Sequence, residues 1–281
     1  MAELEGKVAI VTGSGRGIGK AVAKVFAREG AKVVVASRTP ATVEAVAQEI
    51  RDEGHTALGV PTDVSQKDQI LAMVATTVEH YGTVDILINN AQGFGTAEKP
   101  RASTIPTPIE DTDDAEWDYT FRTGATATLW GMQAVFPYMK EHGGRIVNFA
   151  SGSGMDGFPG NTPYNATKEA IRALTRTAAR EWGKYAISVN TVNPSLRTDA
   201  WENWEANNCI GILQHATGSG KTVTAISAIR SHVKEGKCAL VIVPSILLLK
   251  QWNEELRKDI SDPLIILCGG GHTAWERNEY I

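Results

Sequence analysis

Short apolar runs alternate with longer amphipathic stretches along the first two thirds of the chain. The runs at residues 7–11, 32–36, 57–61, 84–89, 146–149 and 187–192 are typical of buried strands. Between them, apolar residues recur at spacings of three and four, which predicts helices over residues 20–29, 41–52, 66–81, 116–139 and 164–182. This alternation predicts an α/β fold in which a parallel sheet is covered by helices on both faces.

Composition narrows the class of protein. The chain has 281 residues and a formal net charge of −4, which gives no general affinity for nucleic acid or for an anionic membrane. No run of about 18 apolar residues occurs, so no membrane span is expected. The acidic start lacks an apolar targeting core, and we expect a soluble, cytoplasmic protein. Cys209, Cys238 and Cys268 show no metal-ligand spacing, so we expect no metal site.

The segment 151–168 carries the candidate chemistry. Tyr164 and Lys168 are four residues apart, so a helix places them on one face. The ammonium favours the phenolate and would lower the phenol pKa from its usual ~10 toward a working range. The Ser151 hydroxyl could hold a substrate carbonyl oxygen while Tyr164 moves the proton. Because side chains cannot supply the hydride, the chain should bind a nicotinamide. The alternative is an ordinary surface pair on an amphipathic helix.

A glycine-rich turn, TGSGRGIG at residues 12–19, follows the first predicted strand. Gly13, Gly17 and Gly19 allow a tight turn and a close approach of the backbone to a pyrophosphate. The helix that begins after the turn points its free N–H groups at that anion. The sequence therefore predicts a dinucleotide site beside the first strand.

Together these motifs resemble the short-chain dehydrogenase/reductase family over residues 1–200. The matching signatures are Thr12-Gly13-x-x-x-Gly17-x-Gly19, Asp63-Val64, Asn89-Asn90-Ala91, Ser151 and Tyr164-x-x-x-Lys168. The resemblance implies a Rossmann-type doubly wound parallel sheet and hydride transfer between NAD(P)(H) and a carbonyl or secondary alcohol.

The resemblance also implies residue roles. Tyr164 would be the acid/base, Lys168 would tune it and bind the nicotinamide ribose, and Ser151 would position the substrate. Asp63 would contact the adenine edge. The full set of implied cofactor-binding residues is Gly13, Ser14, Arg16, Gly17, Ile18, Gly19, Ser37, Arg38, Asp63, Val64, Asn90, Ala91, Tyr164, Lys168, Pro194 and Thr198.

The second predicted strand ends in Ser37-Arg38, without the acidic residue that an NAD-preferring site usually places there. Arg16 sits inside the glycine turn. Two cations and no carboxylate suit a ribose 2′-phosphate, so we expect NADP(H) to be preferred over NAD(H). The alternative is that Arg38 is a solvated loop charge.

The chain departs from the family pattern at several places. Gln92 stands where a glycine usually follows Asn-Asn-Ala, and Gly124 aligns with the family's active-site asparagine, which helps to hold a proton-relay water. Residues 93–115 read as an exposed loop, either a rim of the substrate pocket or an insertion without a role. The family's usual lid and final strand are not recognisable after residue 200, which predicts impaired activity.

The tail carries a different signature. A predicted strand at 209–214 precedes Gly218-Ser219-Gly220-Lys221-Thr222, a loop that can hold ATP phosphates, with Thr222 as a Mg²⁺ ligand. Residues 201–281 resemble the start of a superfamily-two helicase motor domain, but the later Asp-Glu pair and the second motor domain are missing. The segment also has no basic excess. We expect Mg-ATP binding at most, and no nucleic-acid binding.

We therefore expect two parts, a Rossmann-type dehydrogenase domain at 1–200 and a truncated P-loop α/β segment at 201–281. The tail either docks on the first sheet or forms a small sheet of its own. A homodimer through the two long helices is expected. Three functions remain open, namely an NADP-dependent oxidoreductase acting on a small carbonyl or alcohol substrate, an ATP-binding or nucleic-acid interaction module, and a hybrid chain with little turnover.

Overall fold

The structure, a computed structural model, describes residues 2–194. Thr198, Gly218, Ser219, Gly220, Lys221, Thr222 and the whole predicted segment 201–281 lie outside the described residues. The domain boundary at residue 200 therefore stays a prediction.

Six parallel strands form the central sheet. They are β1 (Val8–Thr12), β2 (Lys32–Ser37), β3 (Ala57–Pro61), β4 (Ile86–Asn89), β7 (Gly144–Phe149) and β8 (Ile187–Val192). Their order is β3-β2-β1-β4-β7-β8, so the chain winds first to one side of β1 and then to the other. Ligands of such folds bind outside the carboxyl ends of the strands at this switch point. The predicted doubly wound α/β fold is confirmed.

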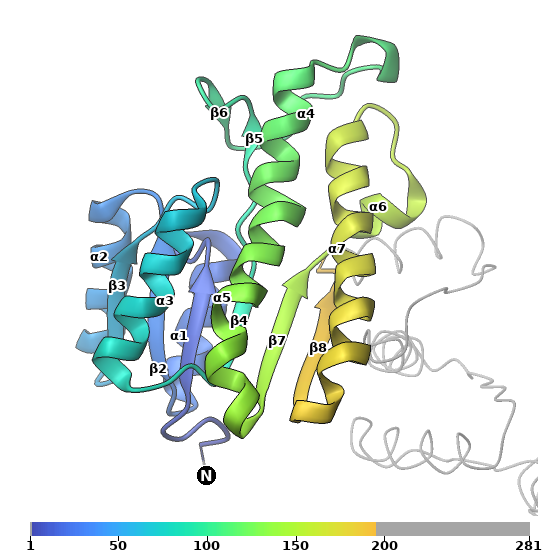
Figure 1. The fold of residues 1–281 in the computed structure, drawn as a ribbon. Helices are drawn as coiled ribbons and strands as arrows, with labels where there is room; N and C mark the ends of the chain where they lie inside the picture. The colour runs from blue at the N-terminus through green and yellow to red at the C-terminus, as the bar shows by residue number, and fades with distance from the viewer. Residues whose placement is uncertain (1, 195–281) are drawn as a thin grey trace, which may run out of the picture. The chain divides into compact units, whose positions relative to one another are not determined.

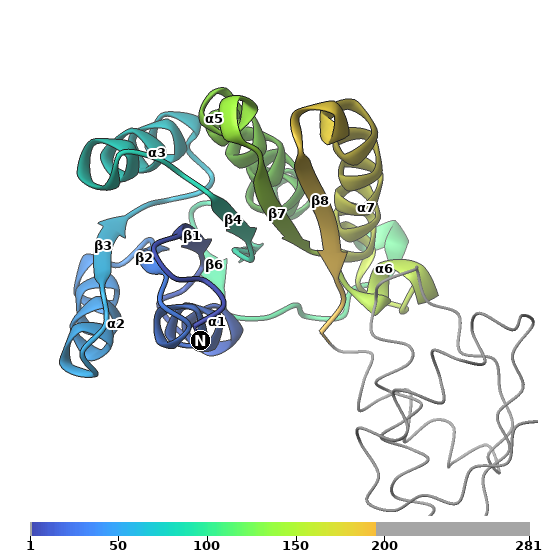
Figure 2. The same cartoon turned by 90° about the horizontal axis from the view of Figure 1, so that it is seen from below.

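Helices cover both faces of the sheet, as predicted. On one face lie α3 (Lys67–Tyr81), α5 (Ala127–His142) and α7 (Thr162–Trp182), and on the other lie α1 (Gly17–Arg28) and α2 (Pro40–Asp52) (Figure 2). The first described residues lie at the amino ends of the strands, opposite the arrowheads (Figure 1).

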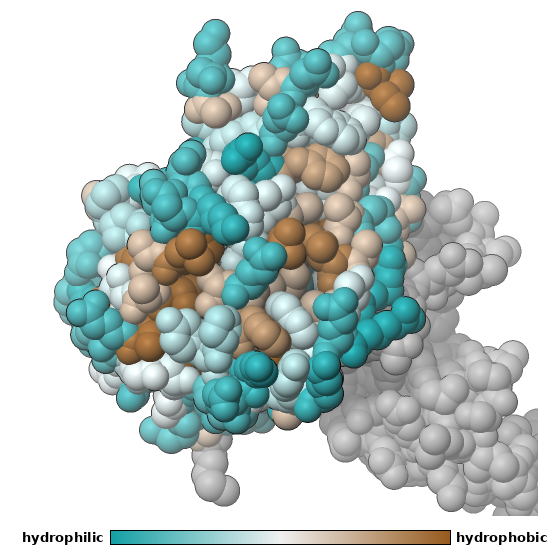
Figure 3. Space-filling view, viewed as in Figure 1, coloured by the Kyte–Doolittle hydropathy of each residue, from teal (hydrophilic) through white to brown (hydrophobic). Residues whose placement is uncertain are grey.

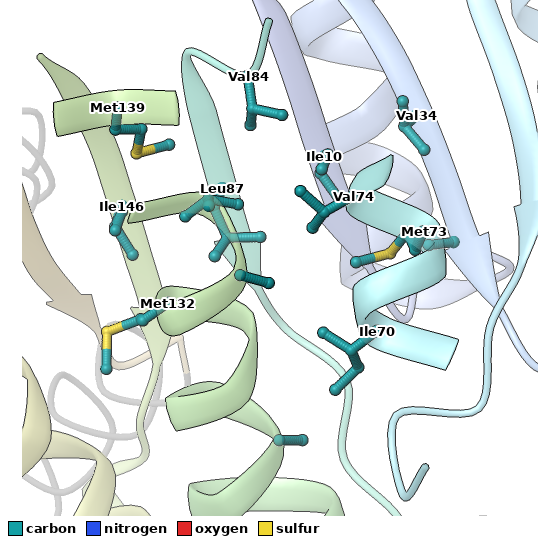
Figure 4. Close-up of a cluster of buried hydrophobic side chains, with 14 of the residues drawn as sticks. Ile10, Val34, Ile70, Met73, Val74, Val84, Leu87, Met132, Met139 and Ile146 are labelled. Carbon is teal, nitrogen blue, oxygen red and sulfur yellow. The ribbon is translucent and has the colours of Figure 1, made fainter. Parts of the chain in front are cut away.

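Two apolar clusters, one on each face, hold these layers together. In the larger one, Leu87 and Ile146 of the sheet pack with Met73 of α3 and Met139 of α5 (Figure 4). In the other, alanine and valine side chains of α1 and α2 pack on β1 and β2. Strands buried on both faces read as continuous apolar runs, which is why the sequence pattern located them.

The largest differences between predicted and observed helix boundaries concern α1 and the rod that contains α4 and α5. Helix α1 begins at Gly17 rather than at residue 20, because the glycine turn itself forms its first turn. The predicted helix 116–139 is one longer rod with three parts: α4 (Asp114–Phe121), a π-helical turn (Arg122–Thr126) and α5, which runs on to His142.

Residues 93–115 contain more regular secondary structure than predicted. They contain an antiparallel pair, β5 (Phe94–Gly95) and β6 (Pro100–Arg101), a 3₁₀ turn (Ile109–Asp111) and the start of α4. A short helix, α6 (Gly152–Asp156), and a 3₁₀ turn (Gly183–Tyr185) were also not predicted. Strands and helices this short lie below what a periodic pattern can reveal.

The face carrying α3, α5 and α7 shows apolar patches between hydrophilic residues (Figure 3). Leu71 of α3 and Tyr138 of α5 are among the exposed large hydrophobic residues. Within residues 2–194, no helix is both long and apolar enough to cross a membrane.

Candidate active site

The glycine turn is clamped to the end of β4. The Asn90 side-chain amide donates to the carbonyl oxygens of Thr12, at 2.9 Å, and Gly13, at 3.3 Å. A Cβ atom at Gly19 would lie 2.5 Å from both Asn90 Nδ2 and the Gly13 oxygen. Gly13 also has a φ of +68°, which other residues rarely adopt. The turn is therefore held at a fixed distance from the switch point.

The start of α1 is open. Gly17 has a φ of +57°, and a Cβ atom there would meet no atom within 4 Å. Arg16, at the N-cap, makes no side-chain capping bond, and Arg16, Gly17 and Ile18 are exposed. The N-terminus of a helix with an accessible backbone suits an anion. The residues present therefore fit the phosphates of a dinucleotide.

Other predicted cofactor residues surround this turn. Ser14 is fully buried, and its hydroxyl donates to the Val11 oxygen at 2.7 Å and accepts from Ala36 N–H at 2.9 Å. That hydroxyl ties the turn to β2, and the cofactor contact of Ser14 stays a prediction. Val64 belongs to the larger apolar cluster.

Arg38 and Asp63 follow the ends of β2 and β3. The Arg38 guanidinium donates to the Tyr119 hydroxyl at 2.9 Å and Arg38 is exposed, so both views of its role remain open. Asp63 accepts from Ser65 N–H at 2.9 Å and remains half-buried. The half-buried residues Ser37, Asn90 and Ala91 lie at the same carboxyl edge, and the exposed Pro194 follows the end of β8.

Ser151, Tyr164 and Lys168 come from two elements. Ser151 follows β7, caps α6 by accepting from Ser153 N–H at 3.2 Å, and is buried. Tyr164 and Lys168 share a face of α7, with Lys168 Nζ 5.5 Å from the centre of the Tyr164 ring. Lys168 is 3% exposed and donates to the Phe149 carbonyl oxygen at 2.8 Å. The alternative of a surface pair is therefore wrong.

The pKa of the Tyr164 phenol is shifted in the direction opposite to the prediction. Burial raises the pKa of Tyr164, while the nearby Ser151 side chain acts in the opposite direction. Burial also lowers the pKa of Lys168 to about 7. Lys168 is thus poised between its two protonation states near neutrality, and the favourable influence on the phenol comes from Ser151.

A hollow opens beside Tyr164. Its wall includes Phe94, Thr107, Asp113, Glu116, Thr120 and Pro163. The Phe94 ring lies 5.5 Å from the Tyr164 ring, and Thr107 N–H donates to the Gly160 oxygen at 2.9 Å. Most of these residues belong to the 93–115 segment and α4. Of the two alternatives for that segment, the structure favours the pocket rim.

Sequence reasoning missed the surroundings of Gly124. Gly124 is buried in the π-helical turn, next to Thr167 of α7 and Gln92. Ala125 N–H donates to the Thr167 hydroxyl at 2.9 Å, and the Gln92 amide is held by backbone oxygens. The departures at residues 92 and 124 were visible in the sequence, but their contact was not. Within the described residues, no group of three or more potential ligands could hold a metal ion.

Comparison with known proteins identifies the family. The family model for short chain dehydrogenase matches residues 7–208, so the chain belongs to the short-chain dehydrogenase/reductase family. It is an oxidoreductase of this class, and the family uses NAD(P)(H). A second model, for the res subunit of type III restriction enzymes, matches residues 164–272 and overlaps the first.

Relatives with named activities cover most of the same region. The chain is 37% identical to a 12alpha-hydroxysteroid dehydrogenase from a Clostridium species, over 73% of this chain and 78% of the relative. It is 38% identical to trans-4-hydroxycyclohexanecarboxylate dehydrogenase from Sinomonas cyclohexanicum, over 68% and 73%. A short chain dehydrogenase from Mycobacterium smegmatis superposes with a TM-score of 0.64 at 32% identity, covering 70% of this chain and 79% of that structure.

Proposed function

We propose that the protein interconverts a secondary alcohol and its carbonyl compound with NADP(H). The observation that carries this proposal is the buried Lys168 against the ring of Tyr164, whose phenol is influenced by the buried Ser151 and which lines the hollow. The two relatives described above are named for hydroxylated ring compounds, which supports a secondary alcohol as the substrate class.

A nicotinamide dinucleotide, when bound, supplies or accepts the hydride at the substrate carbon. The protein's own residues manage the oxygen and its proton. In reduction, the Tyr164 phenol gives its proton to the carbonyl oxygen, and the Ser151 hydroxyl holds that oxygen in place. Lys168 lies against the Tyr164 ring and stabilises the phenolate that remains when it is protonated. Oxidation of the alcohol reverses these steps.

Preference for NADP(H) follows from charge at the end of β2. Arg38 is exposed, donates to Tyr119 and has no carboxylate among its hydrogen-bond partners within residues 2–194. Arg16 is the second exposed cation, at the start of α1. Guanidinium groups suit phosphate oxygens. Michaelis constants for NADPH and NADH test this preference. Arg38→Ala should raise the Michaelis constant for NADPH and leave that for NADH unchanged. The exposed control Arg180→Ala should change neither constant. A clear NADH preference in the unmodified protein would refute the assignment.

A screen of cyclic and open-chain ketones with NADPH tests the activity. The consumption of NADPH is measured by its absorbance. Turnover of at least one ketone that is lost in Tyr164→Phe supports the proposal. A protein that binds NADPH but reduces nothing in the panel would point to the hybrid chain with impaired turnover.

We also propose that the protein forms a homodimer through its two long helices. Helices α5 and α7 cover one face of the sheet, and this face shows apolar patches (Figure 3). Their pairing in a homodimer is checked by light scattering, and a stable tetramer would count against it.

A second function, ATP binding by the tail, is favoured by the match at residues 164–272. The candidate phosphate-binding residues are Gly218 to Thr222, with Lys221 as the anchor. Titration with Mg-ATP, in parallel with Lys221→Ala, tests this function separately from NADPH binding. Equally weak Mg-ATP binding by the unmodified protein and by Lys221→Ala would contradict this function.

A further inference from the structure

Arg38 and Tyr119 form a hydrogen bond across the switch point of the sheet. Arg38 follows β2, and Tyr119 lies on α4, which the chain reaches after β4. In the sheet, β1 separates β2 from β4, so the two residues come from opposite sides of the glycine turn that follows β1. The Arg38 Nη1 atom lies 2.9 Å from the Tyr119 hydroxyl oxygen. Ligands of such folds bind at this point, so the pair borders the expected dinucleotide site.

Packing fixes the position of the Tyr119 side chain. The residue is 5% exposed, and a Cβ atom at Gly93 would lie 2.8 Å from the Tyr119 Cε1 atom. One turn further along, the Thr123 hydroxyl donates to the Tyr119 carbonyl oxygen at 2.8 Å. Arg38 is exposed, and a long exposed side chain of this type has many rotamers of similar energy. The bond to a packed tyrosine restricts these rotamers, so Tyr119 determines where the guanidinium lies.

The bond leaves one edge of the guanidinium available to a ligand. A guanidinium has five N–H donors in a planar fork. Tyr119 engages Nη1, and within residues 2–194 the Arg38 side chain makes no other hydrogen bond. The edge formed by Nε and Nη2 therefore keeps two parallel donors. This arrangement binds a phosphate group in a bidentate manner.

Tyr119 orients the guanidinium without cancelling its charge. Burial raises the pKa of Tyr119 above its usual value, the Arg38 guanidinium opposes this shift, and the Asp63 carboxylate adds to it. The phenol is therefore neutral near pH 7, and its oxygen accepts the Arg38 N–H as an uncharged group. A carboxylate in its place would form an ion pair and weaken the attraction of Arg38 for an anion. A neutral partner of fixed position suits a phosphate-binding arginine.

We propose that Tyr119 is a specificity-determining residue for NADP(H), which positions the Arg38 guanidinium for the ribose 2′-phosphate. This inference rests on the proposed function and extends the phosphate site from the end of β2 to α4. Glu116 and Thr120 of the same helix line the hollow beside Tyr164. The helix that orients the cofactor's phosphate partner is thus also a wall of the substrate site.

Tyr119→Phe removes the hydroxyl and keeps the packed ring. The probes are adenosine 2′,5′-bisphosphate, which carries the ribose 2′-phosphate, and 5′-AMP, which lacks it, both titrated by calorimetry without substrate. We expect the dissociation constant of the bisphosphate to rise about three- to tenfold, the range of one hydrogen bond. That of 5′-AMP should stay within about twofold, which also shows that the variant is folded. A purely structural change would weaken the binding of both probes.

Tyr138→Phe provides the matched control. Tyr138 is exposed on α5, and its hydroxyl makes no hydrogen bond within residues 2–194. Removing this hydroxyl should leave both dissociation constants unchanged.

A double-mutant cycle with Arg38→Ala tests whether Tyr119 acts through Arg38. In the Arg38→Ala background, Tyr119→Phe should change the dissociation constant of the bisphosphate by less than about twofold. An undiminished effect of Tyr119→Phe in that background would contradict a positioning role, because the hydroxyl would then act on the ligand without the guanidinium.

The outcomes separate this inference from the proposed function. Neither probe reacts, so these measurements do not depend on ketone turnover, which tests the oxidoreductase activity separately. An unmodified protein that binds the bisphosphate no more tightly than 5′-AMP would overturn both the NADP(H) preference and the role of Tyr119. A protein that prefers the bisphosphate, and whose Tyr119→Phe variant keeps the same preference, would overturn the role of Tyr119 alone.

Discussion

Replacing Lys168 by methionine should stabilise the protein near neutral pH while abolishing its chemistry. Methionine keeps most of the volume of the lysine stem and removes a charge that burial makes costly. Lys168 is 3% exposed, and its pKa is lowered from 10.5 to about 7. The folded state therefore binds fewer protons than the unfolded state between these two values. Stability must rise with pH across that window, and it falls as the pH drops toward 7.

The magnitude follows from the size of the shift. One pKa unit corresponds to about 1.4 kcal/mol, so the lysine costs about 4 kcal/mol at pH 7 and about 2 kcal/mol at pH 9. Methionine leaves the Phe149 oxygen without its donor, which costs about 1–3 kcal/mol at any pH. We therefore expect Lys168→Met to be more stable than the unmodified protein by about 1–3 kcal/mol at pH 7. This gain should shrink by about 2 kcal/mol at pH 9.

Urea unfolding of both proteins at pH 7, 8 and 9, followed by circular dichroism, measures the difference. The exposed Lys67 provides the control, because Lys67→Met should leave the difference independent of pH. The pH-dependent part isolates the lysine, since the loss at Phe149 does not titrate. A stability difference that stays constant from pH 7 to pH 9 would refute the reasoning.

Further predictions concern the tyrosine and the glycine turn. Tyr164→Phe should keep NADPH binding and lower kcat by about 10²-fold or more, as shown by fluorescence titration and steady-state rates. Gly19→Ala should weaken NADPH binding and lower the melting temperature, since the new methyl group would lie 2.5 Å from Asn90 Nδ2 and the Gly13 oxygen. Gly183→Ala, with open space around it, should leave both unchanged. Asn90→Ala should cost about 1–3 kcal/mol in urea unfolding, because the Thr12 and Gly13 oxygens lose a donor.

Much of the sheet was predictable from the sequence because strands buried on both faces are apolar throughout. Strand β8 begins and ends at the predicted residues 187 and 192. The π-helical turn at residues 122–126 was not predictable, since apolar spacing shows which face is buried but not which carbonyl each N–H reaches. The start of α1 was missed because glycines are poor helix formers, and here the turn geometry overrides that preference.

The residues of the candidate site could be predicted from the sequence, but their burial and their contacts could not. A spacing of four placed Tyr164 and Lys168 on one face, as the structure confirms. Their burial could not be predicted, because charged residues are mostly exposed, and burial decides the pKa of both. Gln92 and Gly124 are far apart in the chain, so their contact exists only once β4 and the π-helical turn are packed together.

The common direction of the six strands has a practical consequence. The start of α7, which carries Tyr164, lies at the arrowhead end of the strands, and the first described residues lie at the opposite end (Figure 1). A tether fixed near the amino terminus would attach the molecule to a bead or sensor chip by the end of the sheet opposite the candidate site. Cofactor and ketone could then reach the catalytic end from the flowing solution.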